Sequence, residues 1–449
     1  MWGSRTGPGL SVRWLPHRLL SGTSDHFIIV LVALTLVRGI AYALLNPPFA
    51  SPDEGSHLQY IAFLAAGGTG EPGQEGSQPV LYYALLAPVY RLMGDSTPAI
   101  HLLAVRMASL LFLLGILCLA WRTARWLDPR NPGLAIGVAS IIAFNPESTS
   151  IAASANNDNA ANLFGAILAL LTCQMLLRPQ HWTAMLLLVV SGLALLTKGN
   201  IFSAVFVGLA ACTLHVARSQ VGVVAKGLSW MLLLAFPVGF VLQVRPGVDP
   251  IDAPRSLMMT MPSKWPALLS SVITTGREPF VYQFRTFWAS FIGDSVRVAS
   301  FWYVVLAIVI LLSAFGHLRW AYKRVVLRCA PVGRRELVLL AFAVACALQL
   351  ATSLIYYMGF LGSISMGLLG STVGWDPIFR RPEVFLQGRY LFPVLVPFSV
   401  LLMDGLQKLW AGCWERWLPL AVIGMMMALD FSSLLALIST YAWPVPDAW

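Results

Sequence analysis

Residues 26–45 read HFIIVLVALTLVRGIAYALL, an apolar run whose one residue charged at neutral pH is Arg38. A helix of about 20 apolar residues spans the hydrocarbon core of a lipid bilayer. Similar runs recur along the chain, and together they predict eleven transmembrane helices. The ten further spans are 101–121, 133–151, 158–177, 182–197, 200–216, 225–243, 299–316, 336–358, 388–405 and 418–439.

The composition excludes a water-soluble globular domain. Of the 449 residues, 57% are hydrophobic and 11% are charged, whereas soluble domains carry roughly 25% charged residues. The apolar runs are also too long for the short alternating strands of a β-barrel. The predicted fold is therefore an all-α polytopic bundle, with one transmembrane unit over 26–439. A basic segment 1–25 precedes this unit, and an outward tail 440–449 follows it.

The positive charges fall on alternate connections between the predicted spans. This asymmetry follows the positive-inside rule and predicts a cytoplasmic amino terminus. The segments 46–100, 145–157, 244–298 and 359–387 then face outward. A full crossing by the shorter apolar segment 79–93 would reverse every later loop, so we expect this segment to be re-entrant or interfacial. The basic connections hold Arg5, Arg13, Arg18, Arg122, Arg125, Arg130, Arg178, Arg218, Lys226, Arg319, Lys323, Arg324, Arg328, Arg334, Arg335, Lys408 and Arg416.

This charge distribution accounts for the net charge of +10, so a nucleic-acid partner is not expected. The first helix is expected to be retained, because no clear signal-cleavage site follows it. None of the six cysteines lies in a predicted outward segment, so neither a disulfide nor a thiolate metal site is expected there.

The first outward segment opens with 51–57, which reads SPDEGSH. Ser51 is placed to cap a helix that begins at Pro52, and Glu54 would complete a capping box. The helix is expected to reach Ala66, stop at the following glycine pair and lie at the membrane interface. Asp53, Glu54 and His57 would then project from one face. A purely structural role remains an alternative, because acids in a first turn also stabilise the helix dipole.

Further polar residues enter the membrane from the same side. Gln78 precedes Tyr82 and Tyr83, which fit either a binding surface or an ordinary aromatic belt. The stretch 156–159 reads NNDN and includes Asn157 and Asp158. One such side chain is enough to cap a helix. The surplus favours a hydroxyl-rich ligand or a metal ion.

Three cations stand at outward boundaries of the predicted spans, namely Lys198, Arg285 and Arg389, the last followed by Tyr390. Each could serve a helix turn or reach lipid headgroups. Arginine can also hold phosphate in a bidentate contact. These cations are therefore candidate phosphate ligands.

In these features the chain resembles the GT-C superfamily of polyprenyl-phosphate-sugar-dependent glycosyltransferases, and within it the protein O-mannosyltransferase and lipid A aminoarabinose transferase branch. It looks closer still to a related group of predicted bacterial membrane proteins. The chain is expected to lack the large C-terminal outward domain of better-known members, and Val80 replaces a frequent second proline. The motifs that carry the resemblance are Pro52-Asp53-Glu54 with His57, Gln78-Pro79 with Leu81-Tyr82-Tyr83, Asn157-Asp158-Asn159, Thr197-Lys198 and Gln387-Gly388-Arg389-Tyr390.

The resemblance implies transfer of a sugar from a lipid phosphate to an acceptor hydroxyl, with inversion at C1 if the reaction is a single displacement. The family's catalytic acid falls on Asp53, with Glu54 beside it. Lys198, Arg285 and Arg389 would stabilise the departing phosphate. A divalent cation such as Mg²⁺ or Mn²⁺, held by Asp53, Glu54, His57 or Asp158, could replace one of these cations. The acceptor would be a glycan, a lipid or a protein. The expected location is a bacterial cytoplasmic membrane, with the site on its outer face.

Three other functions remain compatible with the sequence. A secondary transporter has many helices too, but it usually places ionisable groups near the bilayer midplane. A ligase or polymerase of lipid-linked oligosaccharides would share the same architecture. A structural subunit of an envelope complex would not need the acidic residues at positions 53 and 54.

Overall fold

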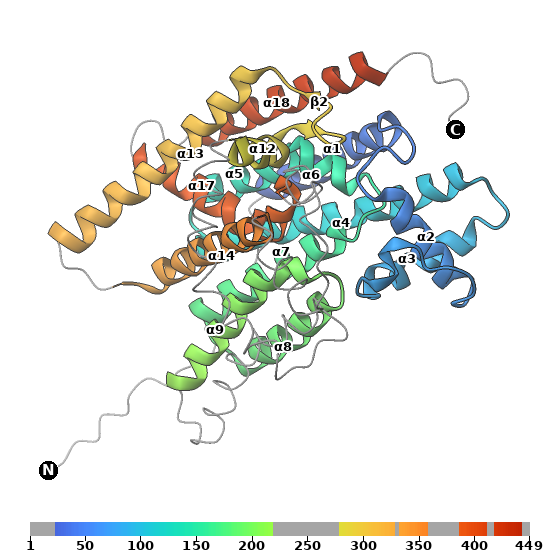
Figure 1. Ribbon diagram of the computed structural model, residues 1–449. Coiled ribbons are helices and arrows are strands. Elements are labelled where there is room, and N and C mark those ends of the chain that lie inside the picture. The colour runs from blue at the N-terminus through green and yellow to red at the C-terminus, as the bar shows by residue number, and fades with distance from the viewer. Residues whose placement is uncertain (1–22, 219–277, 328–331, 358–385, 411–416, 442–449) are drawn as a thin grey trace, which may run out of the picture.

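The computed structural model describes residues 23–218, 278–327, 332–357, 386–410 and 417–441, and they form an all-α bundle (Figure 1). The α-helices are α1 Thr23–Leu45, α2 Glu54–Ala65, α3 Leu81–Leu92, α4 Pro98–Leu127, α5 Pro132–Ala143, α6 Pro146–Ala152, α7 Asp158–Leu177, α8 His181–Leu195, α9 Phe202–Arg218, α12 Glu278–Trp288, α13 Ser300–Ala321, α14 Arg334–Tyr357, α17 Leu395–Leu409 and α18 Leu418–Tyr441.

Short elements join these helices. The 3₁₀ turns are η1 Gln74–Ser77, η2 Gly199–Ile201 and η5 Gly388–Val394, and η3 Tyr322–Leu327 is a π-helical turn. Strands β1 Ser290–Phe291 and β2 Val296–Arg297 pair antiparallel in a small hairpin. Its turn contains three successive residues with positive φ, from Ile292 to Asp294.

Within the described residues, eight helices are long and apolar enough to cross a membrane, and a ninth if a bent pair counts as one span. Ten of the eleven predicted spans coincide with described helices, although α8 is only 15 residues long. The predicted span 225–243 lies outside the described residues. Helix α3 has 12 residues, or about 18 Å at 1.5 Å per residue. This length agrees with an incomplete crossing by 79–93.

The predicted span 133–151 is not one straight helix, and this corrects the sequence interpretation. Helices α5 and α6 meet at a bend of 58°. Pro146 lies at the start of α6, and the Asn145 side chain accepts a hydrogen bond from the Ser148 amide. A proline is well accommodated in a first helical turn but not in a helix interior, so the chain starts a new helix here.

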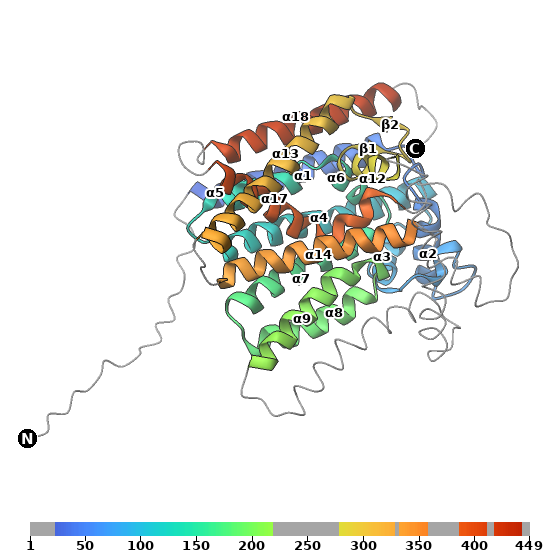
Figure 2. The ribbon, with the colours of Figure 1, turned by 60° about the vertical axis from the view of Figure 1, so that its left-hand side comes forward.

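Helices α4 and α7 lie at the centre of the bundle. Helix α4 packs against α1, α5 and α7, while α13 and α18 cover one side (Figures 1 and 2). Only 22% of the apolar 18-residue stretch of α13 is buried inside the protein, compared with 67% of the corresponding stretch of α7. Large exposed side chains such as Leu311 and Leu318 face outward from α13. Apolar residues on the outside of a helical bundle are expected where lipid is the solvent.

The basic residues and the predicted site lie at opposite ends of the bundle. At one end Arg335 contacts two acids. Asp128 directly follows α4, and Asp404 lies within α17. At the other end lie α2, α3, α12 and the β1–β2 hairpin (Figure 2). The predicted orientation of these two ends in the membrane stays a prediction.

Candidate functional site

The first outward segment turns sharply before α2 begins. Asp53 adopts left-handed backbone (φ 61°), and the helix begins at Glu54 instead of Pro52. The predicted capping box is wrong, because no side chain caps this helix. The helix does end at Ala65, before glycines with positive φ at positions 67 and 68. Because Asp53 is outside the helix, its side chain and those of Glu54 and His57 point to different partners.

Glu54 is held inside the bundle by Arg106 of α4. Its two carboxylate oxygens accept from Arg106 at 2.9 and 2.6 Å, and the Ala155 amide donates to it at 3.0 Å. Both charged side chains are fully buried. Arg106 thereby fixes the end of α1 and the start of the loop, since it also donates to the carbonyls of Ala43, Asn46 and Pro47. The structure thus places Glu54, predicted beside the catalytic acid, in a structural ion pair.

Asp53 instead faces Arg389, which lies in η5. The Asp53 side chain is 54% exposed, and its Oδ2 accepts from an Arg389 Nη2 at 3.0 Å. The Arg389 side chain is 3% exposed. Its Nε and Nη1 atoms have no hydrogen-bond partner among the described residues. Nε lies beside the Asp158 carboxylate at 3.6 Å. Buried N–H groups are usually satisfied, so Nη1 is available to a bound anion.

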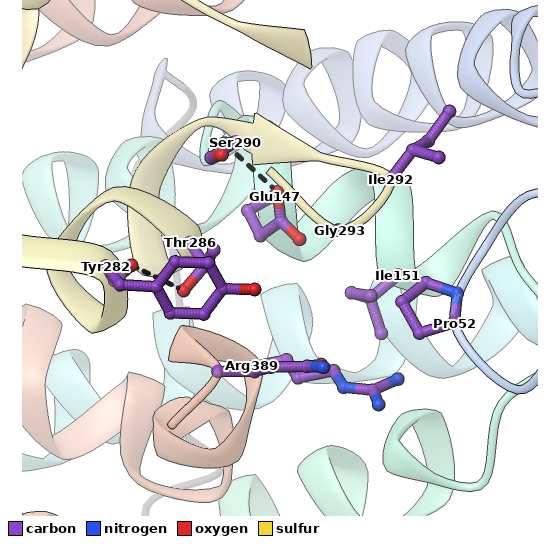
Figure 3. Close-up of a pocket in the computed structure, with 10 residues that line it drawn as sticks. Pro52, Glu147, Ile151, Tyr282, Thr286, Ser290, Ile292, Gly293 and Arg389 are labelled. Atoms are coloured by element: carbon purple, nitrogen blue, oxygen red, sulfur yellow. Dashed lines mark hydrogen bonds between the residues drawn. The ribbon is translucent and has the colours of Figure 1, made fainter. Parts of the chain in front are cut away.

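A small pocket lies beside Arg389 (Figure 3). Glu147 of α6 and Ser290 of β1 lie on the opposite wall. The pocket reaches the first loop through Pro52, the residue before Asp53. It is therefore continuous with the Asp53–Arg389 pair.

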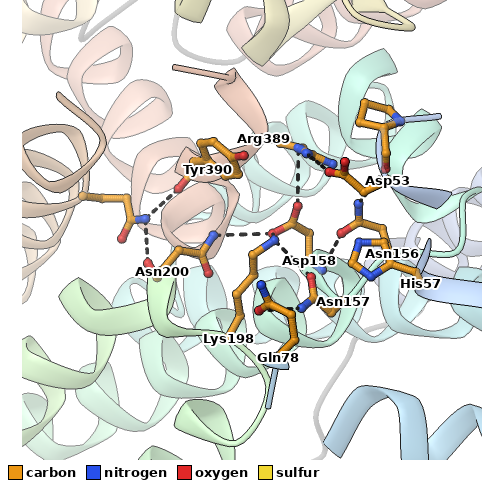
Figure 4. A network of polar contacts seen from close by, with 12 residues as sticks. Asp53, His57, Gln78, Asn156, Asn157, Asp158, Lys198, Asn200, Arg389 and Tyr390 are labelled. Carbon is orange, nitrogen blue, oxygen red and sulfur yellow. Dashed lines mark hydrogen bonds and ion pairs between the residues drawn. The ribbon is translucent and has the colours of Figure 1, made fainter. Parts of the chain in front are cut away.

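A chain of polar contacts extends from the other side of Arg389 (Figure 4). Asp158 Oδ2 lies 3.6 Å from Arg389 Nε, and Asp158 Oδ1 lies 2.8 Å from Lys198 Nζ. Lys198 also donates to Asn157 at 3.0 Å. The Asn157 amide reaches Gln78 at 3.5 Å, the limit of a hydrogen bond. Five residues predicted from four separate segments, together with Asp53, thus meet in one network.

Supporting contacts hold this network in place. The Gln349 side chain donates to the carbonyls of Asn200 and Tyr390 at 2.8 and 2.6 Å. The Tyr390 ring lies 5.7 Å from Lys198 Nζ and 5.4 Å from the guanidinium of Arg389. The predicted Tyr390 therefore borders both cations. Gln349 was not predicted, because a lone glutamine in an apolar span gives no sign of its partners.

His57 and the tyrosines of α3 form a buried layer behind the network. His57 Nδ1 lies 3.0 Å from the Tyr83 hydroxyl, and Tyr82 contacts Ser109 at 3.2 Å. Burial, followed by the charges of Lys198 and Arg389, lowers the pKa of His57 to about 3. His57 is therefore neutral at physiological pH and does not act as a cation here.

Glu75, in η1, is a further acid near Asp53 that the sequence did not single out. Burial and then the nearby Asp53 charge raise the pKa of Glu75. It lies in a stretch rich in glycine and acidic residues, where nothing distinguishes it from a solvated loop residue.

A third predicted cation, Arg285 of α12, has its guanidinium over the Tyr303 ring at 5.8 Å. Lys198 and Arg389 are the predicted cations that join the network.

The predicted metal ligands do not assemble into a metal site. In the described part of the chain, no three His, Cys, Asp or Glu side chains are grouped to hold an ion. Glu54 is taken up by Arg106, and Arg389 occupies the space between Asp53 and Asp158. The described residues, as arranged, therefore do not form a site for Mg²⁺ or Mn²⁺.

Comparisons with known proteins give matches to solved structures alone. No family model matches the chain, and neither does any curated protein sequence. An oligosaccharyltransferase from Archaeoglobus fulgidus in the apo form is 12% identical, with a TM-score of 0.49. The archaeal oligosaccharyltransferase AglB from the same organism, in complex with an inhibitory peptide and a dolichol-phosphate, is also 12% identical, with a TM-score of 0.48.

These matches cover 91% and 92% of this chain but 56% of each neighbour. The chain thus spans about half the length of the structures it matches. Similarity at this level does not transfer an activity from those proteins.

Proposed function

We propose that the protein is a membrane glycosyltransferase that moves a sugar from a polyprenyl-phosphate donor to an acceptor hydroxyl. The observation that carries this proposal is the contact between the half-exposed Asp53 and the buried Arg389, with Lys198 close by on Asp158. A carboxylate and two cations are thereby gathered at the end of a membrane bundle. A lipid-linked donor must react at such a boundary, because its apolar chain stays in the bilayer.

Asp53 acts as the general base in this reaction. The acceptor hydroxyl attacks C1 of the sugar, gives its proton to the Asp53 carboxylate, and the bond between C1 and the phosphate oxygen breaks. Partial exposure of Asp53 lets an acceptor reach it from solvent. A single displacement of this kind inverts the configuration at C1. Recovery of a product with the donor's anomeric configuration would argue against this step.

Arg389 and Lys198 stabilise the phosphate that leaves. A phosphate monoester needs no proton donor on departure, but its negative charge gains from fixed donors in a site with little water. The buried Nη1 of Arg389, which has no hydrogen-bond partner among the described residues, supplies such a donor. Asp158 holds both cations in place, and the neutral His57 contributes packing behind them.

The buried Glu54–Arg106 pair positions Asp53 in this account. Glu54 follows Asp53 directly in the chain, and its ion pair anchors the turn to α4. The left-handed backbone at Asp53 costs energy that such an anchor can offset. We therefore assign Glu54 to positioning and Asp53 to catalysis.

We propose the outer face of a bacterial cytoplasmic membrane as the location, and a glycan, lipid or protein as the acceptor.

The test is an assay of purified full-length protein with a panel of radiolabelled polyprenyl-phosphate sugars. Release of free polyprenyl phosphate is expected from wild type, and Asp53→Asn is expected to reduce it by about 10²- to 10⁴-fold, the usual contribution of a general base. Asp95→Asn makes the same change at an exposed position and serves as the matched control.

Two outcomes of this assay would count against the proposal. Equal release by wild type and Asp53→Asn would remove Asp53 from the chemistry. Failure of the wild type to turn over any donor in the panel, combined with sugar transport in proteoliposomes, would favour a transporter.

A further inference from the structure

The backbone on both sides of Arg389 is held by side chains from other helices. Before it, the Gly388 amide donates a hydrogen bond to Thr286 Oγ1, of α12, at 2.7 Å. After it, the Tyr390 carbonyl accepts from the side chain of Gln349, of α14, at 2.6 Å. Thr286 is 5% exposed and Gln349 is 1% exposed. The turn that presents Arg389 is therefore fixed on both sides by buried side chains.

The two helices that supply these contacts are also joined to each other. Gln283, one turn before Thr286 on α12, donates to Ser353 of α14 at 2.5 Å. Ser353 lies one turn after Gln349, whose side-chain oxygen accepts from Ser203 of α9. The hydrogen bonds therefore close a ring through α12, η5 and α14. A buried polar network whose members are satisfied rigidifies the backbone that it holds.

Gly388 allows α12 to lie directly against η5. A Cβ added at Gly388 would lie 2.0 Å from the Phe287 amide nitrogen. Phe287 is held from another direction as well, because the Asn145 side chain donates to its carbonyl at 3.2 Å. The Thr286 hydroxyl donates its proton to the Tyr282 carbonyl at 2.8 Å (Figure 3), which leaves its oxygen to accept from the Gly388 amide. A displacement of α12 would therefore move the start of η5.

The contacts of the Arg389 side chain cannot hold it in this way during the proposed reaction. Its Nη2 pairs with Asp53 at 3.0 Å, but Asp53 is the base that must receive a proton. Its Nε lies 3.6 Å from Asp158, beyond the normal hydrogen-bond range of about 2.7–3.2 Å. The bonds to the Gly388 and Tyr390 backbone are shorter and do not involve Asp53. A displacement of about 1 Å in a catalytic group can cost about 10²-fold in rate.

We propose that Thr286 and Gln349 are positioning residues that hold Arg389 in place for the lipid phosphate. This inference rests on the proposed function, because it uses the phosphate position beside Arg389. It gives α12, which lies within the predicted outward segment 244–298, a role in the site. The effect of either residue on phosphate binding is then exerted through Arg389.

The experiment measures the affinity of purified full-length protein in nanodiscs for bare polyprenyl phosphate. Thr286→Val keeps the branched shape of the side chain but removes the acceptor of the Gly388 amide. It is expected to weaken binding by about 10- to 100-fold, which corresponds to the cost of a buried donor left without a partner. Gln349→Met keeps a long side chain, removes the donor to Tyr390 and is expected to weaken binding as well.

Two further variants serve as matched references. Thr286→Ser keeps the hydroxyl and is expected to restore most of the affinity that Thr286→Val loses. Thr123→Val makes the same change at a fully buried threonine of α4, whose hydroxyl donates to the Leu119 carbonyl of its own helix at 2.8 Å. Thr123 lies near the end of α4 that Asp128 follows, away from the site, so this variant is expected to bind as the wild type does.

A double-mutant cycle separates positioning from a general loss of stability. Arg389→Gln is expected to weaken phosphate binding by itself. Because Thr286 acts through Arg389, Thr286→Val is expected to cause no further loss of affinity when Arg389→Gln is already present. A merely structural role would give the same proportional loss with and without Arg389→Gln. Thr286→Ser and Gln349→Met keep the inference testable if Arg389→Gln folds poorly.

The outcomes distinguish the inference from the proposed function. The positioning role is overturned, while the Asp53 reaction stands, if Thr286→Val and Gln349→Met bind as tightly as the wild type. It is also overturned if Thr286→Ser binds as weakly as Thr286→Val, or if the losses in the cycle add. If the wild type does not bind polyprenyl phosphate, or if Arg389→Gln binds it equally well, the proposed function itself fails and this inference fails with it.

Discussion

At position 53 the chain combines three properties that rarely occur together. The residue is a carboxylate, its backbone is left-handed at φ 61°, and its side chain touches a buried arginine 336 positions later. Non-glycine residues in this backbone region cost of order 1–3 kcal/mol and cluster at functional sites. The sequence predicted both Asp53 and Arg389 from their places at membrane boundaries. It could not predict their contact, because nothing local connects them.

The position of Glu54 shows where local reasoning fails. A capping box was a sound expectation from the residue types alone, but Arg106 competes for the same carboxylate from 52 residues away. Once Arg106 is buried, loss of its counter-charge would cost about 3–5 kcal/mol, which is more than a helix cap worth about 1 kcal/mol. The signal that could have pointed to Arg106 was its position as a charge inside a span.

Loss of the Glu54 charge should destabilise the protein strongly. Glu54→Gln leaves the Arg106 charge buried without a counter-charge, which typically costs about 3–5 kcal/mol. Thermal unfolding of the purified protein in detergent measures this effect. Glu71→Gln removes a charge at an exposed site and should change stability by less than about 0.5 kcal/mol. Equal melting temperatures for the two variants would contradict the structural role of the pair.

The buried His57 predicts a pH dependence of stability. Its pKa is lowered from 6.5 to about 3 in the folded protein, so the unfolded chain binds a proton more readily. The stability from neutral His57 is therefore complete above pH 6.5 and is lost progressively as the pH falls toward 3. At pH 5 the loss is about 2 kcal/mol, from 1.4 kcal/mol per pH unit.

Comparison with His57→Gln isolates this contribution, since glutamine cannot take up a proton in this range. Between pH 7.5 and pH 5 the wild type should lose about 2 kcal/mol more stability than the variant. Parallel losses in the two proteins would show that His57 remains solvated and titrates normally.

At the scale of elements, the site depends on how closely α7 and η5 approach. Helix α7 begins with Asp158 and η5 contains Arg389. Gly165 makes the approach possible, because a Cβ added there would lie 2.1 Å from the Pro393 carbonyl oxygen. The sequence predicted both segments as spans. The sequence could not predict that α7 and η5 pack together, because one glycine in an apolar run does not reveal which backbone it faces.

Gly165→Ala should therefore push α7 and η5 apart and disturb the Asp158–Arg389 contact. Overpacking of this kind typically costs about 1–3 kcal/mol, and donor turnover should fall with stability. Gly192→Ala is the matched control, because an added Cβ on α8 meets nothing within 4 Å. The comparison uses unfolding temperature and turnover. Equal behaviour of the two variants would mean that the close approach is not required.

At the scale of the whole molecule, the described part of the predicted basic connections includes Arg335 and Lys408, which contact Asp404 at the end of the bundle opposite to Asp53. Composition and run length were enough for the all-α membrane fold, since lipid demands long apolar helices. The bend between α5 and α6 was missed, because hydropathy does not register a break of direction at Asn145-Pro146.

The two ends should face opposite sides of the membrane. With the six native cysteines replaced by serine, Asp95→Cys should react with a membrane-impermeant thiol reagent added to intact cells. Arg130→Cys, at the basic end, should react only after the membrane is opened. The reverse pattern would place the site in the cytoplasm and contradict the proposed orientation.

The most direct test of the account is to locate a donor phosphate experimentally. A cryo-electron microscopy structure of the full-length protein saturated with polyprenyl phosphate should show the phosphate contacting Arg389 and Lys198 at about 2.7–3.2 Å, the normal hydrogen-bond range. The apolar chain should run into the bilayer, and Asp53 should remain free to receive an acceptor. A phosphate bound elsewhere, with the Asp53–Arg389 pair undisturbed, would contradict the central claim.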